Sequence, residues 1–234
     1  MKLLSVMCLF LVALAYGQGV TRTVAPNSLD FNLYQNQGAS INDESALGYS
    51  GTAFLNKELT QARLIVNGGN TQVFFMRYNI LEDRMEFSPK KNISNLKAMP
   101  KSSDIVINLQ GKRFQFLNAS LKNNNRSGYY EIIHAYDENT LLVIKHKKSI
   151  LEREGSQSSM YSMKTRSTLK DSKELFLFED NNLTELSNNK KRLLKILPKE
   201  YKKALSTFIK DNKIKFNDDY RGLTATIKQY LALK

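Results

Sequence analysis

Between about residue 51 and residue 178, short apolar runs alternate with polar residues and are separated by turn residues. Met85 and Phe87, for example, stand between Arg84, Glu86 and Ser88. Such alternation is typical of strands with one buried face. No helical period intervenes, and strands that follow one another through short turns pair antiparallel. We therefore expect an antiparallel β domain, mainly a meander, over residues 51–180. A curved sheet, a sandwich and a partly open barrel all fit this pattern.

Several neighbouring runs predict β-hairpins because turn-forming residues lie between them. In the turn Gln110-Gly111, the glycine can take a positive φ without steric cost. We expect the run at 173–178 to be the last strand of the sheet. The turns predicted for the hairpins are 67–70, 110–111 and 137–139.

The C-terminal segment, residues 181–234, predicts two to three amphipathic helices because its apolar residues recur at helical spacing. Helices of this kind cover a sheet or one another. The fold class expected for the whole chain is therefore α+β, with the helical segment packed on or beside the β domain. The residues expected to begin the helices are Ser187 or Asn188, then Pro198, then Asp218 or Asp219.

The first residues predict export. A positive residue precedes an apolar run over 3–14, and small residues follow at the positions that a signal peptidase reads, so we expect a signal peptide over 1–17. The apolar run is too short for the roughly 20 residues of a spanning helix. Residues 18–50 are polar and predict an N-terminal arm.

Cys8, the only cysteine, lies inside that apolar run. The mature chain would then contain no cysteine, and neither a disulfide nor a thiolate metal site could form. An exported chain held by its core alone favours a bacterial envelope, with a periplasmic, outer-membrane-associated or extracellular location.

The segment 75–87 reads FMRYNILEDRMEF, and the end of the chain carries short apolar and polar stretches at 175–178, 182–186 and 212–216. These two parts of the chain resemble exported proteins of Bacteroidetes that have no assigned activity. The resemblance covers about residues 50–232. It implies an exported β-rich body with a helical tail, and it implies no catalytic residues.

Positive charge is concentrated in one region. The chain has a net charge of +13, and residues 189–215 contain ten basic and two acidic residues, a local balance of +8. A second basic stretch, 143–170, has a balance of +5 from seven basic and two acidic residues. Localised positive charge attracts polyanions. The residues predicted to contact a polyanion are Lys190, Lys191, Arg192, Lys195, Lys199, Lys202 and Lys203.

No sequence motif predicts catalysis. The chain lacks the common nucleophile, metalloprotease and phosphate-loop motifs, and no cofactor is predicted. Its two histidines, His134 and His146, lie on one predicted hairpin, where His134 should face a residue near Val143 rather than His146. A shared metal is therefore not expected.

These observations predict a non-catalytic envelope protein that binds or scaffolds a partner. The expected partners are an envelope polyanion, an anionic membrane surface or another envelope protein, and an exported chain is not expected to bind nucleic acid by sequence. The Ser-rich stretch 155–168 could contribute to the same surface.

An alternative interpretation is a carrier that encloses an apolar ligand in a curved sheet. It depends on a set of aromatic residues that core packing would also explain. These residues are Phe74, Phe75, Phe114, Phe116, Tyr129 and Tyr130.

Overall fold

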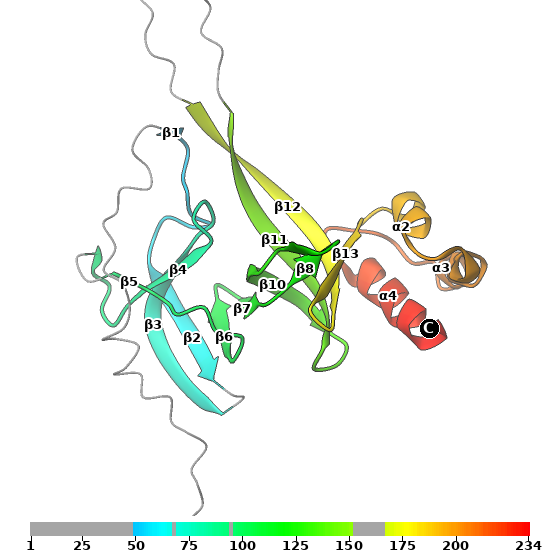
Figure 1. The fold of residues 1–234 in the computed structure, drawn as a ribbon, viewed down its shortest axis with the longest axis horizontal. Coiled ribbons are helices and arrows are strands. Elements are labelled where there is room, and N and C mark those ends of the chain that lie inside the picture. The colour runs from blue at the N-terminus through cyan, green and yellow to red at the C-terminus, as the bar shows by residue number, and fades with distance from the viewer. Residues whose placement is uncertain (1–48, 67–68, 94–95, 152–166) are drawn as a thin grey trace, which may run out of the picture.

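A computed structural model describes residues 49–66, 69–93, 96–151 and 167–234 (Figure 1). The predicted signal peptide, all but the end of the predicted N-terminal arm, and nearly all of the Ser-rich stretch lie outside the described residues. The described chain has an α+β fold, as predicted: a 13-stranded sheet is followed by C-terminal helices.

Most strands pair antiparallel, and the exceptions are the parallel pairs β1–β12 and β13–β8. The strands are β1 (Tyr49–Ser50), β2 (Thr60–Val66), β3 (Asn70–Asn79), β4 (Arg84–Ser88), β5 (Lys97–Ala98), β6 (Ile105–Leu109), β7 (Lys112–Leu117), β8 (Ser120–Leu121), β9 (Asn124–Asn125), β10 (Gly128–Ala135), β11 (Thr140–Leu151), β12 (Ser167–Glu179) and β13 (Asn182–Leu186).

The sheet consists of two meanders joined side by side. Strands β2 to β5 form the first, and β6, β7 and β10 to β13 form the second. β6 pairs with β2, so that the order is β5-β4-β3-β2-β6-β7-β10-β11-β12-β13-β8-β9. β8 follows β7 almost directly in the chain, yet it pairs with β13. In the sheet, β13 is four strands away from β7. The second meander must therefore curl back on itself, and the sheet forms an open half-barrel (Figure 1).

The predicted turn at 110–111 is confirmed. Gln110 and Gly111 both have positive φ, 53° and 75°, which matches a two-residue hairpin turn suited to the twist of the strands. Asp180 and Asn181 repeat this geometry, with φ of 46° and 66°. The second turn leads into β13, so the prediction that 173–178 is the last strand was wrong.

β13 was not apparent in the sequence because its two buried leucines face different cores. Leu183 packs inside the curl of the second meander, whereas Leu186 packs under the helices. Residues three apart in a strand lie on opposite faces, so β13 shows no alternation. The predicted boundary at residue 180 therefore divides the sheet, and helical structure begins only after β13.

Three main hydrophobic clusters hold the structure together. One lies over the first meander and the neighbouring strands β6 and β7, and it includes Met76, Phe87 and Phe114. A second lies inside the curl of the second meander. The third lies between the outer face of that curl and the helices. In β11, Leu141 and Leu142 belong to different clusters, which explains a strand that is apolar on both faces.

The helical segment lies beside β12 and β13 at one end of the molecule, far from β1 to β5 (Figure 1). The predicted amphipathic helices are confirmed, but their first residues differ. Asn189 caps α2, because its side chain accepts a hydrogen bond from the Arg192 N–H, and Ser187 and Asn188 do not. The helices are α2 (Lys190–Ile196), the 3₁₀ helix η2 (Lys199–Tyr201), α3 (Lys202–Asp211) and α4 (Arg221–Leu233).

The other two helix starts are partly as predicted. Pro198 precedes the short η2 rather than α3, which begins only at Lys202. The residue before α4 is Tyr220, with a left-handed φ of 59°. Asp219 still contributes, since its carboxylate accepts a hydrogen bond from the Arg221 N–H at 3.1 Å.

Candidate functional site

The structure brings the predicted polyanion-contacting residues together on three consecutive helices. Leucines and one isoleucine of α2 and α3 point into the core, so the charged residues between them face outward. Lys202 is half-buried and the other six side chains are exposed. We call these residues the basic helical surface: Lys190, Lys191, Arg192, Lys195, Lys199, Lys202 and Lys203.

The positive charge of this surface is not neutralised within the described residues. Among the described residues, every ion pair that the structure shows has its cation outside residues 189–215. The cations that are paired are Arg77, Arg84, Lys112, Lys145, His146, Lys147, Lys148, Arg221 and Lys234. The local excess of +8 is therefore free to act on a partner.

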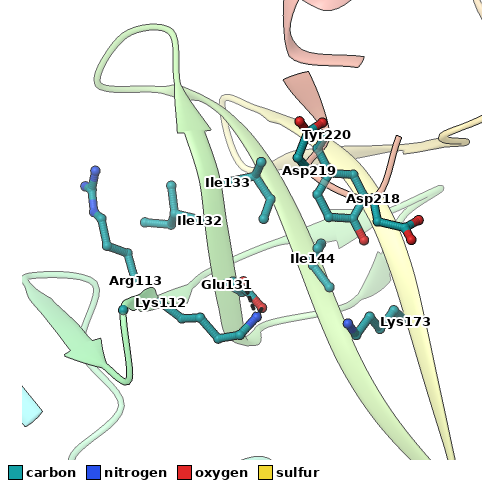
Figure 2. Close-up of a pocket in the computed structure, with 11 residues that line it drawn as sticks. Lys112, Arg113, Glu131, Ile132, Ile133, Ile144, Lys173, Asp218, Asp219 and Tyr220 are labelled. Carbon is teal, nitrogen blue, oxygen red and sulfur yellow. Dashed lines mark hydrogen bonds and ion pairs between the residues drawn. The ribbon is translucent and has the colours of Figure 1, made fainter. Parts of the chain in front are cut away.

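A cleft of about 650 Å³ lies between the β6–β7 turn and the residues that precede α4 (Figure 2). Lys112 and Arg113 form one wall, and Asp218 and Tyr220 belong to the other. Its floor is the outer face of the second meander, with Glu131, Ile133, Ile144 and Lys173.

The charges of this cleft largely offset one another. Lys112 is already paired with Glu131, and two further cations, Arg113 and Lys173, are matched by Asp218 and Asp219. Such a balance favours neither an anion nor a cation. The cleft is therefore a weaker candidate for a charged partner than the basic helical surface.

Glu131 lies at the centre of a buried polar network on the cleft floor. One carboxylate oxygen is 2.6 Å from His146 Nε2, and Lys112 Nζ donates to both oxygens at 2.6 and 2.8 Å. The His146 ring is held between Tyr78 and Phe114, with ring centroids 6.5 and 6.0 Å away. This network was not predicted, although an acid inside the apolar run 129–135 is a signal that a buried partner must exist.

The pKa of Glu131 makes this network sensitive to acid. Burial alone would raise the pKa, but hydrogen bonds from His146 and Lys112 outweigh burial and hold it below the ordinary value of 4.5. Because the pKa of Glu131 is lower in the folded state than in the unfolded state, its ionised form stabilises the fold at a pH above the unfolded-state pKa. This contribution is lost as the pH falls through the folded-state pKa.

We expect the Glu131→Gln variant to differ most from wild type at neutral pH. Urea unfolding should give a large difference in unfolding free energy at pH 7 and a smaller one at a pH well below 4.5, because only the wild-type side chain loses its charge. An equal difference at both pH values would contradict this role of Glu131.

The two histidines lie apart. His134 is exposed and lies opposite Leu142, next to Val143 and not opposite His146, as predicted. His146 is buried and lies opposite Lys173 of β12. Within the part of the chain that the structure describes, no three His, Cys, Asp or Glu side chains are placed to share a metal ion.

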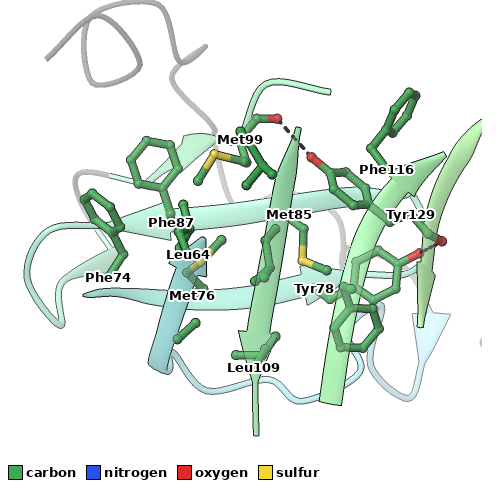
Figure 3. Close-up of a cluster of buried hydrophobic side chains, with 14 of the residues drawn as sticks. Leu64, Phe74, Met76, Tyr78, Met85, Phe87, Met99, Leu109, Phe116 and Tyr129 are labelled. Atoms are coloured by element: carbon green, nitrogen blue, oxygen red, sulfur yellow. Dashed lines mark hydrogen bonds between the residues drawn. The ribbon is translucent and has the colours of Figure 1, made fainter. Parts of the chain in front are cut away.

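Most of the aromatic residues that suggested a carrier pack against other aromatic rings in the core. Phe74 meets Phe87 at 5.4 Å between ring centroids, and Phe116 meets Tyr129 at 5.5 Å (Figure 3). Phe75 is half-buried. Edge-to-face contacts at these distances are ordinary core packing, which accounts for these rings without a ligand.

No protein-family model, curated protein or solved structure matches this chain. The resemblance to exported proteins of Bacteroidetes therefore stays a prediction. No helix among the described residues is both long enough and apolar enough to span a membrane.

Proposed function

We propose that this protein is a non-catalytic component of a bacterial envelope that binds an anionic polymer or surface through the basic helical surface. The observation that carries the proposal is the set of outward-facing cations on α2, η2 and α3 that have no ion-pair partner among the described residues. Release of counterions from a polyanion would drive the binding.

The packing of the helices supports this proposal. Leu193, Leu205 and Leu223, one from each α-helix, are fully buried against the outer face of the second meander. The apolar sides of the helices are thus occupied by the sheet, and their charged sides are held in fixed relative positions. A partner therefore meets a preformed array of cations and does not have to order it.

Export and an envelope location are part of the same proposal. They are supported by the apolar run near the start of the sequence and by the absence of cysteine after it. The polyanions of an envelope carry phosphate and carboxylate groups, which lysine and arginine bind by charge.

The test is charge reversal at Lys190, Lys191, Lys202 and Lys203. Changing all four to Glu takes the balance of 189–215 from +8 to 0. We expect wild type to bind vesicles that contain phosphatidylglycerol, and an anionic polysaccharide column, at low salt. The variant should lose most of this binding, because the attraction depends on the local charge.

A matched control reverses four exposed lysines elsewhere, Lys57, Lys90, Lys91 and Lys122. It has the same net charge as the first variant but keeps the basic helical surface. The control should bind nearly as wild type does, and both variants should keep the wild-type circular dichroism spectrum. Equal losses in the two variants would mean that net charge alone causes binding, and the proposal would be wrong.

A further inference from the structure

A smaller cavity, about 160 Å³, lies farther along β11 and β12 than the cleft. His146 and Lys148 of β11 lie directly opposite Lys173 and Asp171 of β12, and all four line the cavity. Its other wall comes from the segment between β1 and β2 and from the end of β3. The residues of that wall are Thr52, Phe54, Leu55 and Ile80.

This second wall is fixed by backbone hydrogen bonds. β1 pairs with the first residues of β12, and the chain then crosses to β3, where the Leu55 N–H donates to Tyr78 O at 2.9 Å. The Ile80 N–H donates to Ala53 O, also at 2.9 Å. The Phe54 ring is held from behind by the Arg77 guanidinium, 3.8 Å from its centroid. The cavity is therefore preformed.

Lys148 is the unusual residue of this cavity. Its side chain is only 4% exposed, and its ion-pair partner among the described residues is Asp171, whose side chain is 76% exposed. An ammonium group has three N–H donors, and burying it is unfavourable unless it is paired and hydrogen-bonded. One carboxylate at the solvent boundary cannot fill all three positions, so the remaining donors require oxygen acceptors inside the cavity.

The surroundings favour an anion as the source of these oxygens. Lys173 is exposed, lines both the cleft and this cavity, and forms no ion pair with the described residues, so within this cavity Lys148 and Lys173 face one carboxylate. The Thr52 hydroxyl accepts a hydrogen bond from the Phe54 N–H at 3.2 Å, which leaves its own O–H free to donate. The volume corresponds to about five waters at ~30 Å³ each, enough for a small oxyanion.

We propose that this cavity binds one phosphate group, with Lys148 as its buried counter-ion and with Asp171 displaced toward solvent when the anion enters. Lys148 and Lys173 line the cavity from the paired strands β11 and β12, and Thr52 lines it from the opposite wall, so an anion between the walls can accept hydrogen bonds from both sides. A phosphate group offers more oxygen acceptors for these donors than a carboxylate does. None of the residues that line the cavity belongs to the basic helical surface, so this proposal does not depend on the proposed function.

The test is isothermal titration of the purified full chain with inorganic phosphate. Wild type should bind one equivalent. Lys148→Met should weaken the affinity at least tenfold, and it should still fold, because the partner that remains, Asp171, already faces solvent and is not left as a buried unpaired charge. Asp171→Asn should instead bind phosphate more tightly, since it removes the competing carboxylate.

Lys170→Met is the matched control. Lys170 precedes Asp171, is exposed and does not line the cavity, so this variant loses the same charge and should keep the wild-type affinity. Equal weakening by Lys148→Met and Lys170→Met would overturn the proposal, and so would a failure of both wild type and Asp171→Asn to bind. A parallel titration with glycerol phosphate identifies the source: tighter binding than inorganic phosphate indicates a phosphate ester of a polymer or lipid.

Discussion

Glu86→Gln is expected to lower the free energy of unfolding by about 3–5 kcal/mol, the cost of removing one side of a buried ion pair. Glu86 is fully buried in β4, and its Oε2 is 2.7 Å from Nε of Arg77, which is 2% exposed and lies directly opposite on β3. Its Oε1 accepts hydrogen bonds from Arg84 at 2.8 Å and from Asn79 at 3.3 Å. A neutral amide cannot balance the Arg77 guanidinium.

Glu82→Gln is the control for this prediction. Glu82 also pairs with Arg84, but its side chain is 39% exposed, and exposed ion pairs contribute about 0–1 kcal/mol. In urea unfolding at pH 7, the loss of unfolding free energy should therefore be several-fold larger for Glu86→Gln than for Glu82→Gln. A loss for Glu86→Gln no larger than that for Glu82→Gln would show that the buried pair does not stabilise the fold.

Lys148→Met also removes one side of an ion pair, but we expect it to change the free energy of unfolding little. The distinction lies in what remains behind. Removing Glu86 leaves the Arg77 guanidinium buried, whereas removing the Lys148 ammonium leaves only Asp171, which already faces solvent. The same principle thus predicts a large loss of stability in one case and little change in the other.

The strands with one buried face could be predicted from the sequence because apolar residues on the buried face alternate with polar residues on the other face. Ile105, Ile107 and Leu109 of β6 are all buried, and their neighbours are not. The short hairpin of β8 and β9 has no such alternation, because its residues are exposed or half-buried. β13 could not be predicted for a different reason, since its two buried leucines pack in two different hydrophobic clusters on opposite faces of the strand.

The strand order and the buried sites depend on contacts far apart in the sequence. No local pattern indicates that β6 returns to pair with β2, or that β13 reaches β8. The basic helical surface could be predicted because it is a local concentration of charge. The contacts of Glu131 with His146, and of Lys148 with Asp171, depend on strand register, which sequence alone left undetermined.

Gly222→Ala is expected to destabilise the protein by about 2–3 kcal/mol, although the same change inside an exposed helix normally stabilises by about 1 kcal/mol. Gly222 is buried in the first turn of α4, where a Cβ atom would lie 2.0 Å from Lys215 O and 3.0 Å from Ile214 Cγ2. Because the Lys215 atom belongs to the backbone, no side-chain rotation can remove the overlap.

Relief requires α4 to move away from the chain that connects it to α3, and Leu223, the next residue of α4, is fully buried in the core beneath the helices. Gly69→Ala is the control, since a Cβ there meets nothing within 4 Å, and it should change the unfolding free energy by no more than about 0.5 kcal/mol. Thermal and urea unfolding of both variants measure the difference. A Gly222→Ala variant as stable as wild type would mean that α4 does not pack this closely against the residues before it. The anchoring that holds the basic helical surface in place would then be looser than the structure shows.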